Sequence, residues 1–262
     1  MDLGLKDKSV LVAAASKGIG KATALGFLRE GAKVTICARD PVALEATREE
    51  LQAATGGQIV AVAADVSDPQ QLQALVAAAR AAHGEIEVLV NNAGGPPAGS
   101  HTAITSEQWQ QAYELTLQSA VKLTELVLPA MKQAQWGRVV NLSSYSVKQP
   151  MDNMMLSNSI RLAVLGWAKT LANELAADGI LVNTVCPGWT DTDRVASLLQ
   201  QRSATTGATV DQVRDDIAAN VPLGRLASAE EIANVVVFLA SDAASYITGA
   251  AIPVDGGAAK VL

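Results

Sequence analysis

The sequence predicts an α/β fold in which helices cover both faces of a doubly wound parallel sheet. Short β-rich runs alternate with longer segments whose apolar residues recur at helical spacing, and this order of elements requires parallel strands joined by right-handed crossovers. The β-rich runs are apolar throughout, as expected for strands that are buried on both sides. No change of composition divides the chain, so we expect one domain over residues 1–262.

Seven runs carry the strand pattern, and the segments between them carry the helical pattern. The strand runs are SVLVAAA (9–15), AKVTICA (32–38), QIVAVAAD (58–65), IEVLVNN (86–92), GRVVNLSS (137–144), ILVNTVC (180–186) and AAIPVD (250–255). The helical segments are 18–30, 41–55, 69–83, 106–133, 154–177 and 228–240, with ends marked by Gly, Asp or Pro. Ligands of doubly wound sheets bind outside the carboxyl ends of the strands, so we expect the site at those ends.

One segment departs from the alternation. From Gly188 to about Leu226 there is no strand run, and the helical patterns are short and polar. A long insertion beside strand ends is commonly a lid or substrate-binding loop, and a mobile surface excursion is the alternative. We expect a substrate lid over residues 188–226. Arg194, Arg202 and Arg214 are mixed there with several Asp residues, so the segment does not indicate the substrate's charge.

Composition and charge exclude several classes of protein. The net charge is −6 and the Lys and Arg residues are scattered, so we expect no nucleic-acid partner. Lys, Asp or Gly interrupts each apolar run well before the ~20 residues of a membrane span, and the N-terminus lacks the order of a signal peptide. We therefore expect a cytoplasmic protein without membrane contact. Cys37 and Cys186 lie in apolar strand runs and are expected as buried thiols, and no His, Cys and carboxylate cluster has metal-ligand spacing.

A glycine-rich turn follows the first strand run. Gly18 and Gly20 open the next helix, where glycine lets a pyrophosphate approach the backbone and the first N–H groups face the anion. A tight turn without any ligand also uses glycine, so this signal alone is weak. The second strand run ends in CARD, which places Arg39 where the 2′ substituent of a dinucleotide would lie, and the next residue, Asp40, is expected to cap the following helix.

Seven motifs are distributed along the chain: SKGIG (16–20), DVSD (65–68), NNAG (91–94), NLSS (141–144), VCPGWTDT (185–192), PLGRLASAEEIANVVVFLASDAASYITG (222–249) and VDGG (254–257). Together they resemble the motifs of short-chain dehydrogenases/reductases of the 3-oxoacyl-carrier-protein-reductase type. The resemblance covers essentially the whole chain. It implies a seven-stranded Rossmann-type sheet in the order 3-2-1-4-5-6-7, a nicotinamide dinucleotide, and a homotetramer built through the two long helices and the C-terminal strand.

The resemblance also assigns the dinucleotide site. Ser16, Lys17, Gly18, Ile19 and Gly20 would hold the phosphates, Asp65 and Val66 the adenine, Asn92, Ala93 and Gly94 the adenosine side, and Pro187, Gly188, Thr190 and Thr192 the nicotinamide. Lys17 and Arg39 match the basic pair that holds a 2′-phosphate, which favours NADP(H) over NAD(H); two solvated surface cations are the alternative. Ala13 and Ala14 stand where the family has Thr-Gly, so we expect weakened or repositioned cofactor binding.

At the chemical end, the resemblance implies hydride transfer between a nicotinamide and a carbonyl or alcohol. The family uses a Tyr that moves the proton, a Lys four residues later, a Ser thirteen residues before the Tyr and an Asn on an earlier helix. Counted from Ser144, these positions hold Ser157, Arg161 and, for the Asn, Thr116. A serine hydroxyl is a far weaker acid than a phenol, and Arg161 keeps its proton at neutral pH. We expect Ser144 to orient the substrate oxygen, Arg161 to hold the ribose and Ser157 to relay a proton through water.

Two other side chains are candidates for moving the proton. Tyr145 follows Ser144 directly, but neighbouring residues at a strand end tend to point to opposite sides, which favours a packing role. His101 lies in the loop after the fourth strand run, where a solvated histidine is the simpler interpretation.

The sequence therefore predicts an NADP(H)-dependent oxidoreductase with an atypical site, acting on a small-molecule carbonyl or secondary alcohol. A non-catalytic dinucleotide- or ligand-binding protein with the same fold is the alternative, and a lyase or isomerase that uses the cleft without net redox is a third hypothesis.

Overall fold

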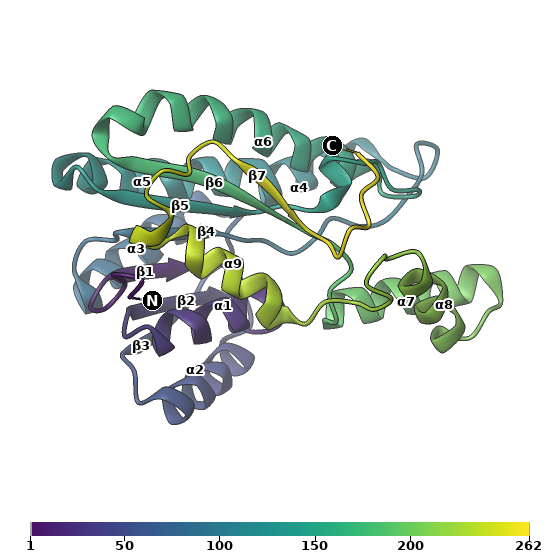
Figure 1. Cartoon of the computed structure of the whole chain (residues 1–262), viewed down its shortest axis with the longest axis horizontal. Helices are drawn as coiled ribbons and strands as arrows, with labels where there is room; N and C mark the ends of the chain where they lie inside the picture. The colour runs from purple at the N-terminus through teal and green to yellow at the C-terminus, as the bar shows by residue number, and fades with distance from the viewer. Residues whose placement is uncertain (1, 262) are drawn as a thin grey trace.

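The computed structural model describes residues 2–261, and within them it confirms the doubly wound sheet. Seven parallel strands pair in the order β3-β2-β1-β4-β5-β6-β7, with helices on both faces (Figure 1). The strand order reverses between β1 and β4, which makes the carboxyl ends of these two strands the expected ligand position. The strands are β1 (Ser9–Val12), β2 (Lys33–Ala38), β3 (Ile59–Ala63), β4 (Val88–Asn91), β5 (Gly137–Leu142), β6 (Ile180–Pro187) and β7 (Ala251–Val254).

Most helices begin at the capping residues that the sequence contains. The carboxylate of Asp40 accepts hydrogen bonds from the N–H groups of Val42 (3.0 Å) and Ala43 (3.2 Å), which confirms its predicted role as a cap. The first helix is different, because it starts at Lys17 and Gly18 without a side-chain cap. The α-helices are α1 (Gly18–Arg29), α2 (Pro41–Thr55), α3 (Pro69–His83), α4 (Ser106–Tyr113), α5 (Ser119–Ala134), α6 (Met155–Leu175), α7 (Asp193–Thr206), α8 (Val210–Ala219) and α9 (Ala229–Leu239).

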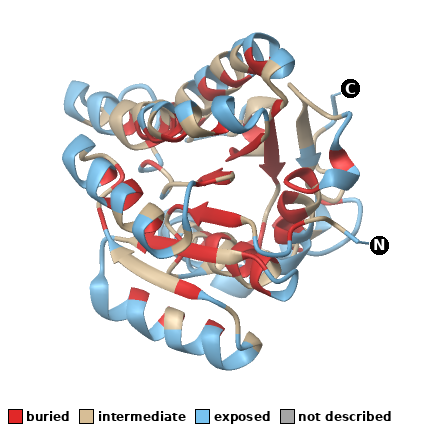
Figure 2. Cartoon of the chain, turned by 90° about the vertical axis from the view of Figure 1, so that its left-hand side faces the viewer, coloured by how far each residue is buried: buried red, intermediate tan, exposed pale blue. Residues whose placement is uncertain are grey.

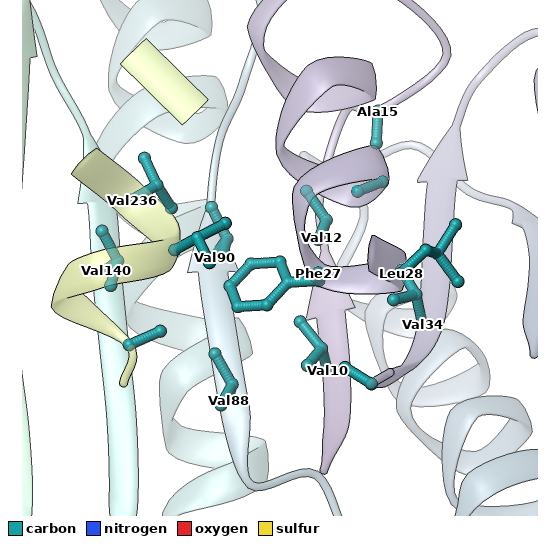
Figure 3. Packing of buried hydrophobic residues seen from close by; sticks show 14 of the residues in the cluster. Val10, Val12, Ala15, Phe27, Leu28, Val34, Val88, Val90, Val140 and Val236 are labelled. Atoms are coloured by element: carbon teal, nitrogen blue, oxygen red, sulfur yellow. The ribbon is translucent and has the colours of Figure 1, made fainter. Parts of the chain in front are cut away.

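The core lies in two layers, one on each face of the sheet. Successive strand residues point to opposite faces, so Val10 and Val12 pack with α1, α2 and α9, whereas Leu11 packs with α3, α5 and α6. Figure 3 shows the buried ring of Phe27 among strand valines in the first layer. Buried residues gather along the central strands and on the helix faces turned toward them (Figure 2). Cys37 and Cys186 are both fully buried, as predicted.

The helix predicted over 106–133 contains a wider turn that the sequence pattern did not reveal. The chain runs through α4, then a π-helical turn from Glu114 to Gln118, and then α5. The hydroxyl of Ser119 donates to the carbonyl oxygen of Leu115 (2.5 Å) at the end of this turn. A π-turn adds one residue to a helical turn and is common at functional sites. Here it carries Thr116, the residue at the family's asparagine position, to the end of the sheet.

The segment 188–226 is more ordered than its polar sequence indicates. Helices α7 and α8 stand apart from the main layers (green in Figure 1) and share a small apolar cluster with the chain that follows them. The cluster consists of Val195, Leu199, Val213, Ile217 and Leu226. At its base, the Arg214 guanidinium binds both carboxylate oxygens of Asp191 (3.2 and 2.7 Å). The segment thus contains two helices packed on a small apolar cluster, and its role as a substrate lid stays a prediction.

Strand β1 ends earlier than predicted because of the backbone conformation at Ala14. Its φ is 47°, in the left-handed region, which costs a residue with a Cβ ~1–2 kcal/mol. The turn is tight: a Cβ at Gly20 would lie 2.5 Å from the carbonyl oxygen of Ala14. Glycine is therefore required at position 20, while Ala14 is held in a strained conformation that glycine would adopt freely.

We predict that Ala14→Gly stabilises the protein by about 0.5–1 kcal/mol, because relief of the strained φ exceeds the added flexibility of the unfolded chain. The melting temperature should rise by about 1–3 °C in differential scanning calorimetry. Ala15→Gly is the matched control. Ala15 is fully buried and has no positive φ, so this change should lower the melting temperature. Equal destabilisation by both changes would contradict the strain at position 14.

Candidate active site

A polar cavity lies at the carboxyl ends of β1, β4 and β5, at the predicted position. Its walls include Asn92, Thr116, Ser143 and Arg161, together with apolar residues of α5 and α6. The cavity volume that the centre of a water molecule can occupy is about 20 Å³. This is enough for one water molecule. The cavity thus joins the nucleotide end of the sheet, through Asn92, to the chemical end, through Thr116 and Arg161.

Three buried oxygen atoms around this cavity have no hydrogen-bond partner among residues 2–261. They are Oδ1 of Asn91, Oγ1 of Thr116 and Oγ of Ser143, on residues that are 5%, 7% and 8% exposed. Buried polar atoms are nearly always paired with protein, water or a ligand. These atoms make the cavity suited to a water molecule or to the oxygen of a small ligand.

Arg161 reaches the end of β5 from α6. Its Nη1 donates to the carbonyl oxygens of Leu142 (3.1 Å) and Ser143 (2.9 Å). Within residues 2–261, no carboxylate forms an ion pair with it. Burial and, to a lesser extent, the positive charge of Arg194 together lower the pKa of Arg161 to about 10. The guanidinium is therefore still protonated at neutral pH and is a cation without a counter-ion among the described residues.

The two predicted serines differ in what their hydroxyls do. Ser144 accepts a hydrogen bond from the N–H of Ser146 (3.1 Å), so its own O–H is left to donate. Ser157 is 4% exposed and lies one helical turn before Arg161, on the same face of α6. Its hydroxyl makes no hydrogen bond to the described residues, and it does not line the cavity. The structure thus brings Thr116 and Arg161 together, places Ser144 at the adjoining strand end, and leaves Ser157 out of the cavity wall.

Tyr145 and His101 are not brought to the cavity. Tyr145 is half-buried in a short 3-10 turn, Tyr145–Val147, and is not among the lining residues. Burial raises the pKa of Tyr145, the Trp189 side chain lowers it, and the charge of Asp255 raises it again. The net rise makes this phenol a weaker acid than usual. His101 is exposed in the loop between β4 and α4.

At the nucleotide end, the start of α1 has the form of a phosphate site. Its first N–H groups have no side-chain cap, and Gly18 has a φ of 56°. The side-chain amide of Asn92 donates to the carbonyl oxygens of Ala13 and Ala14 (both 3.1 Å), which fixes the end of β4 against the glycine turn. Free N–H groups at the positive end of a helix dipole suit a pyrophosphate.

The other predicted cofactor residues differ in their surroundings: some are exposed, some bind other side chains, and others line the cavity. Lys17 forms an exposed ion pair with Asp193 of α7 (3.1 Å), so the start of α7 faces the start of α1. Arg39 is exposed and forms no ion pair among residues 2–261. The carboxylate of Asp65 accepts from the N–H (2.9 Å) and hydroxyl (2.7 Å) of Ser67, so it shapes its own turn, and Val66 lines the cavity.

The four residues expected at the nicotinamide continue β6 into the segment 188–226. Pro187 ends β6, and a Cβ at Gly188 would lie 2.7 Å from the Cα of Asp255, so only glycine fits there. The Thr190 hydroxyl donates to the carbonyl oxygen of Gly188 (3.1 Å). A Cβ at Gly18 would lie 3.3 Å from the methyl group of Thr192, which puts Thr192 directly over the glycine turn.

Arg194 is a residue at the cleft that the sequence did not single out. Its Nη2 donates to the carbonyl oxygen of Pro96 (2.6 Å), and a Cβ at Gly95 would lie 3.0 Å from its Nε. It thus spans from α7 to the loop that follows β4. In the sequence, Arg194 is one of several arginines in a polar segment. Its position on α7 turns it toward the loop after β4, whereas Arg202 on the same helix is exposed.

Comparison with known proteins agrees with this architecture. The L-sorbose reductase of Gluconobacter frateurii, solved in complex with NADPH and L-sorbose, superposes with a TM-score of 0.95 at 33% identity over 100% of both chains. The actinorhodin polyketide ketoreductase, solved with NADPH, gives a TM-score of 0.93 at 35% identity over 97% of this chain and 98% of the other. The 3-oxoacyl-[acyl-carrier-protein] reductase FabG of Escherichia coli is 36% identical over 97% of this chain and 98% of its own length.

The fold and the site at the strand ends define an oxidoreductase of the short-chain dehydrogenase/reductase class, as the resemblance predicted. Residues 13–259 match the family model described as Enoyl-(Acyl carrier protein) reductase, so the chain belongs to that family. An oxidoreductase of Bacillus subtilis, YvrD, whose name calls it uncharacterized, is 36% identical over 100% of both chains. Among residues 2–261, no helix is long and apolar enough to cross a membrane, and no group of His, Cys, Asp and Glu is arranged to hold a metal.

We predict that Tyr145→Phe changes the rate of catalysis by less than about threefold, because a positioned general acid contributes ~10²–10⁴ and this phenol is outside the cavity. Steady-state turnover of a reducible carbonyl, with circular dichroism to verify folding, measures the effect. A loss of about a hundredfold or more in a folded variant would identify Tyr145 as the proton donor.

Proposed function

We propose that the protein is an NADP(H)-dependent reductase of a small-molecule carbonyl, or the reverse dehydrogenase of a secondary alcohol, with an atypical proton-transfer site. The observation that carries this proposal is the single cavity that joins Asn92, beside the glycine turn, to Thr116 and Arg161. Hydride transfer from a nicotinamide requires a phosphate site and an oxyanion site that one bound dinucleotide can span. The glycine turn after β1 and the cavity at the ends of β4 and β5 are suited to these two roles. The solved L-sorbose reductase and polyketide ketoreductase both contain NADPH, which supports the choice of cofactor.

The groups around the end of β2 favour the phosphorylated dinucleotide. An NAD-specific site places a carboxylate at the end of this strand, where it accepts from the ribose 2′-hydroxyl. Here the strand ends in Cys37 and Ala38, and the carboxylate of Asp40 is occupied with the N-terminus of α2. Arg39 is exposed for a 2′-phosphate, and the surface ion pair of Lys17 is weak enough to be exchanged for one. Bound there, NADPH would supply the hydride.

In the proposed reaction, the carbonyl carbon gains a hydride and the carbonyl oxygen gains a proton, which gives an alcohol. The O–H of Ser144 donates to the substrate oxygen and orients it. The guanidinium of Arg161, fixed by two backbone carbonyls, stabilises the negative charge that develops on this oxygen. The proton comes from water held at Thr116 and Ser143, and Ser157 takes part in its relay. Arg161 also holds a ribose hydroxyl.

The site is proposed as atypical because Ser157 and Arg161 occupy the positions that hold Tyr and Lys in the family that the sequence resembles. Neither side chain releases a proton near neutral pH. Positioning and electrostatic stabilisation remain, so turnover should be slower than with a phenolic acid by about 10²–10⁴. The homotetramer and the cytoplasmic location stay predictions; Leu162, 52% exposed on α6, is an apolar contact point that such an assembly would cover.

A steady-state assay of NADPH oxidation with a panel of small carbonyl compounds tests the proposal. We expect turnover with at least one compound, and a loss of about a hundredfold or more in the Ser144→Ala, Arg161→Ala double variant. Arg202→Ala, an exposed residue of α7, is the control and should retain full activity. Wild-type turnover no greater than that of the double variant would reject the reductase and leave a dinucleotide- or ligand-binding protein.

The pH dependence of reduction gives a separate test. The reactive form has Arg161 protonated, and the pKa of this group is about 10. We therefore predict that kcat/KM is constant between about pH 6 and pH 9. Above about pH 10 it should fall about tenfold per pH unit, because one proton is lost from Arg161. Circular dichroism over the same range separates this loss from unfolding. A rate that already falls tenfold per pH unit between about pH 6 and pH 8 would show that another acid supplies the proton.

A further inference from the structure

Two arginines reach the substrate end of the cleft from opposite sides. Arg161 extends from α6 and binds the carbonyl oxygens of Leu142 and Ser143 at the end of β5. Arg194 extends from α7 and binds the carbonyl oxygen of Pro96, in the loop that continues β4. The two guanidinium groups therefore contact the end of β5 and the loop that follows β4, the strand paired with β5. They are close enough for the charge of Arg194 to lower the pKa of Arg161.

Neither guanidinium has an anionic partner in the part of the chain that the structure describes. No ion pair within residues 2–261 involves Arg161 or Arg194, whereas Arg214 and Arg225 both have one. Burial also lowers the pKa of Arg194. Each guanidinium has five N–H donors. Arg161 uses only Nη1, so its Nε and Nη2 have no protein acceptor, and Arg194 uses only Nη2. The like charges of the two guanidinium groups repel each other, and an anion between them would offset that repulsion.

A second observation points to a ligand beside Arg161. Thr116 Oγ1 and Ser143 Oγ are buried, unpartnered and part of the cavity wall beside Arg161. The proposed phosphate positions are at the start of α1 and near Arg39. Thr192, at the start of α7, covers the glycine turn. Arg194, two residues further along, is instead turned toward Gly95 and Pro96. The anion that fits between the arginines is therefore on the substrate.

We propose that the substrate is a small oxo acid, or the matching hydroxy acid, whose carboxylate binds between Arg161 and Arg194 while its carbonyl oxygen faces Ser144. This inference rests on the proposed function and names its substrate class. Arginine suits the role because its planar N–H donors bind carboxylates in pairs. The reaction balances as oxo acid, NADPH and one proton giving hydroxy acid and NADP⁺, with the carboxylate unchanged.

Calorimetric titration with 2-oxobutanoate and with its methyl ester, in the presence of NADP⁺, tests the carboxylate site without requiring turnover. The ester keeps the carbonyl, carries one additional methyl group and lacks the charge of the acid. We expect the acid to bind the wild-type protein at least about tenfold more tightly than the ester. Arg194→Gln should weaken binding of the acid by about tenfold or more and leave the ester unaffected. Arg194→Lys should retain part of the preference, because it keeps the charge and loses the paired geometry.

Arg202→Gln is the matched control, since Arg202 is exposed on the same helix and should leave binding of the acid unchanged. Thermal unfolding of each variant verifies that it is folded. Equal binding of acid and ester, equal loss of both in Arg194→Gln, or no binding of the acid at about 10 mM would overturn the carboxylate site.

Turnover of the same pair separates this inference from the proposed function. If the acid binds as expected but NADPH is not oxidised, the carboxylate site stands and the reductase fails. If neutral carbonyls are reduced and the acid does not bind, the reductase stands and the carboxylate site fails. An ester group activates a neighbouring carbonyl toward reduction more strongly than a carboxylate does. Intrinsic reactivity therefore favours the ester, so faster turnover of the acid would have to come from its binding by the protein.

Discussion

The guanidinium of Arg161, fixed to the end of β5 and without a counter-ion among residues 2–261, is the constraint on which the interpretation of this protein depends. Transfer of a charged group out of water is costly unless the group is paired and hydrogen-bonded. Among residues 2–261 the group binds two backbone carbonyl oxygens, and burial together with the charge of Arg194 lowers its pKa to about 10. The energetic cost is met when an anion or a developing negative charge reaches the cleft. The same residue therefore links the proposed stabilisation of an oxyanion to the proposed recognition of a carboxylate.

Three local features of the backbone position the groups around Arg161. The reversal of strand order between β1 and β4 leaves an open crevice at their ends. The π-turn from Glu114 to Gln118 brings Thr116 into the wall of that crevice. The salt bridge between Asp191 and Arg214 holds the base of the segment 188–226, so that Arg194 is presented from a helix with its own apolar cluster. Groups on rigid supports hold a productive geometry better than groups on free loops.

Much of the fold was accessible from the sequence because its signals are local and repeated. Continuous apolar runs predicted the strands, and Asp40 was correctly interpreted as a helix cap. The family motifs fixed the strand order, which periodicity alone does not give. The π-turn was missed because one inserted residue barely changes a helical pattern. The early end of β1 was missed because alanine seldom adopts a positive φ, so nothing in the letter A at position 14 indicates one.

The candidate site was predicted in part, for a physical reason. Ser144 and Arg161 were predicted by spacing from motifs, and the structure places Arg161 in the wall of one cavity and Ser144 beside it. Thr116 was noted only as the residue at the family's asparagine position, and Ser157, which was predicted by the same spacing, does not line the cavity. Arg194 was not found, because a charged residue in a polar segment usually faces water, and only the packing of α7 against the β4 loop turns it inward. Burial and charge pairing are properties of the assembled fold, so spacing rules do not report them.

A crystal structure of the protein with NADPH tests the central claim most directly. The account predicts that Arg161 keeps its bonds to the Leu142 and Ser143 carbonyls and that its remaining N–H groups contact a ribose hydroxyl or a substrate oxygen. A dinucleotide bound elsewhere, or a guanidinium that has turned to pair with a carboxylate of its own chain, would contradict it.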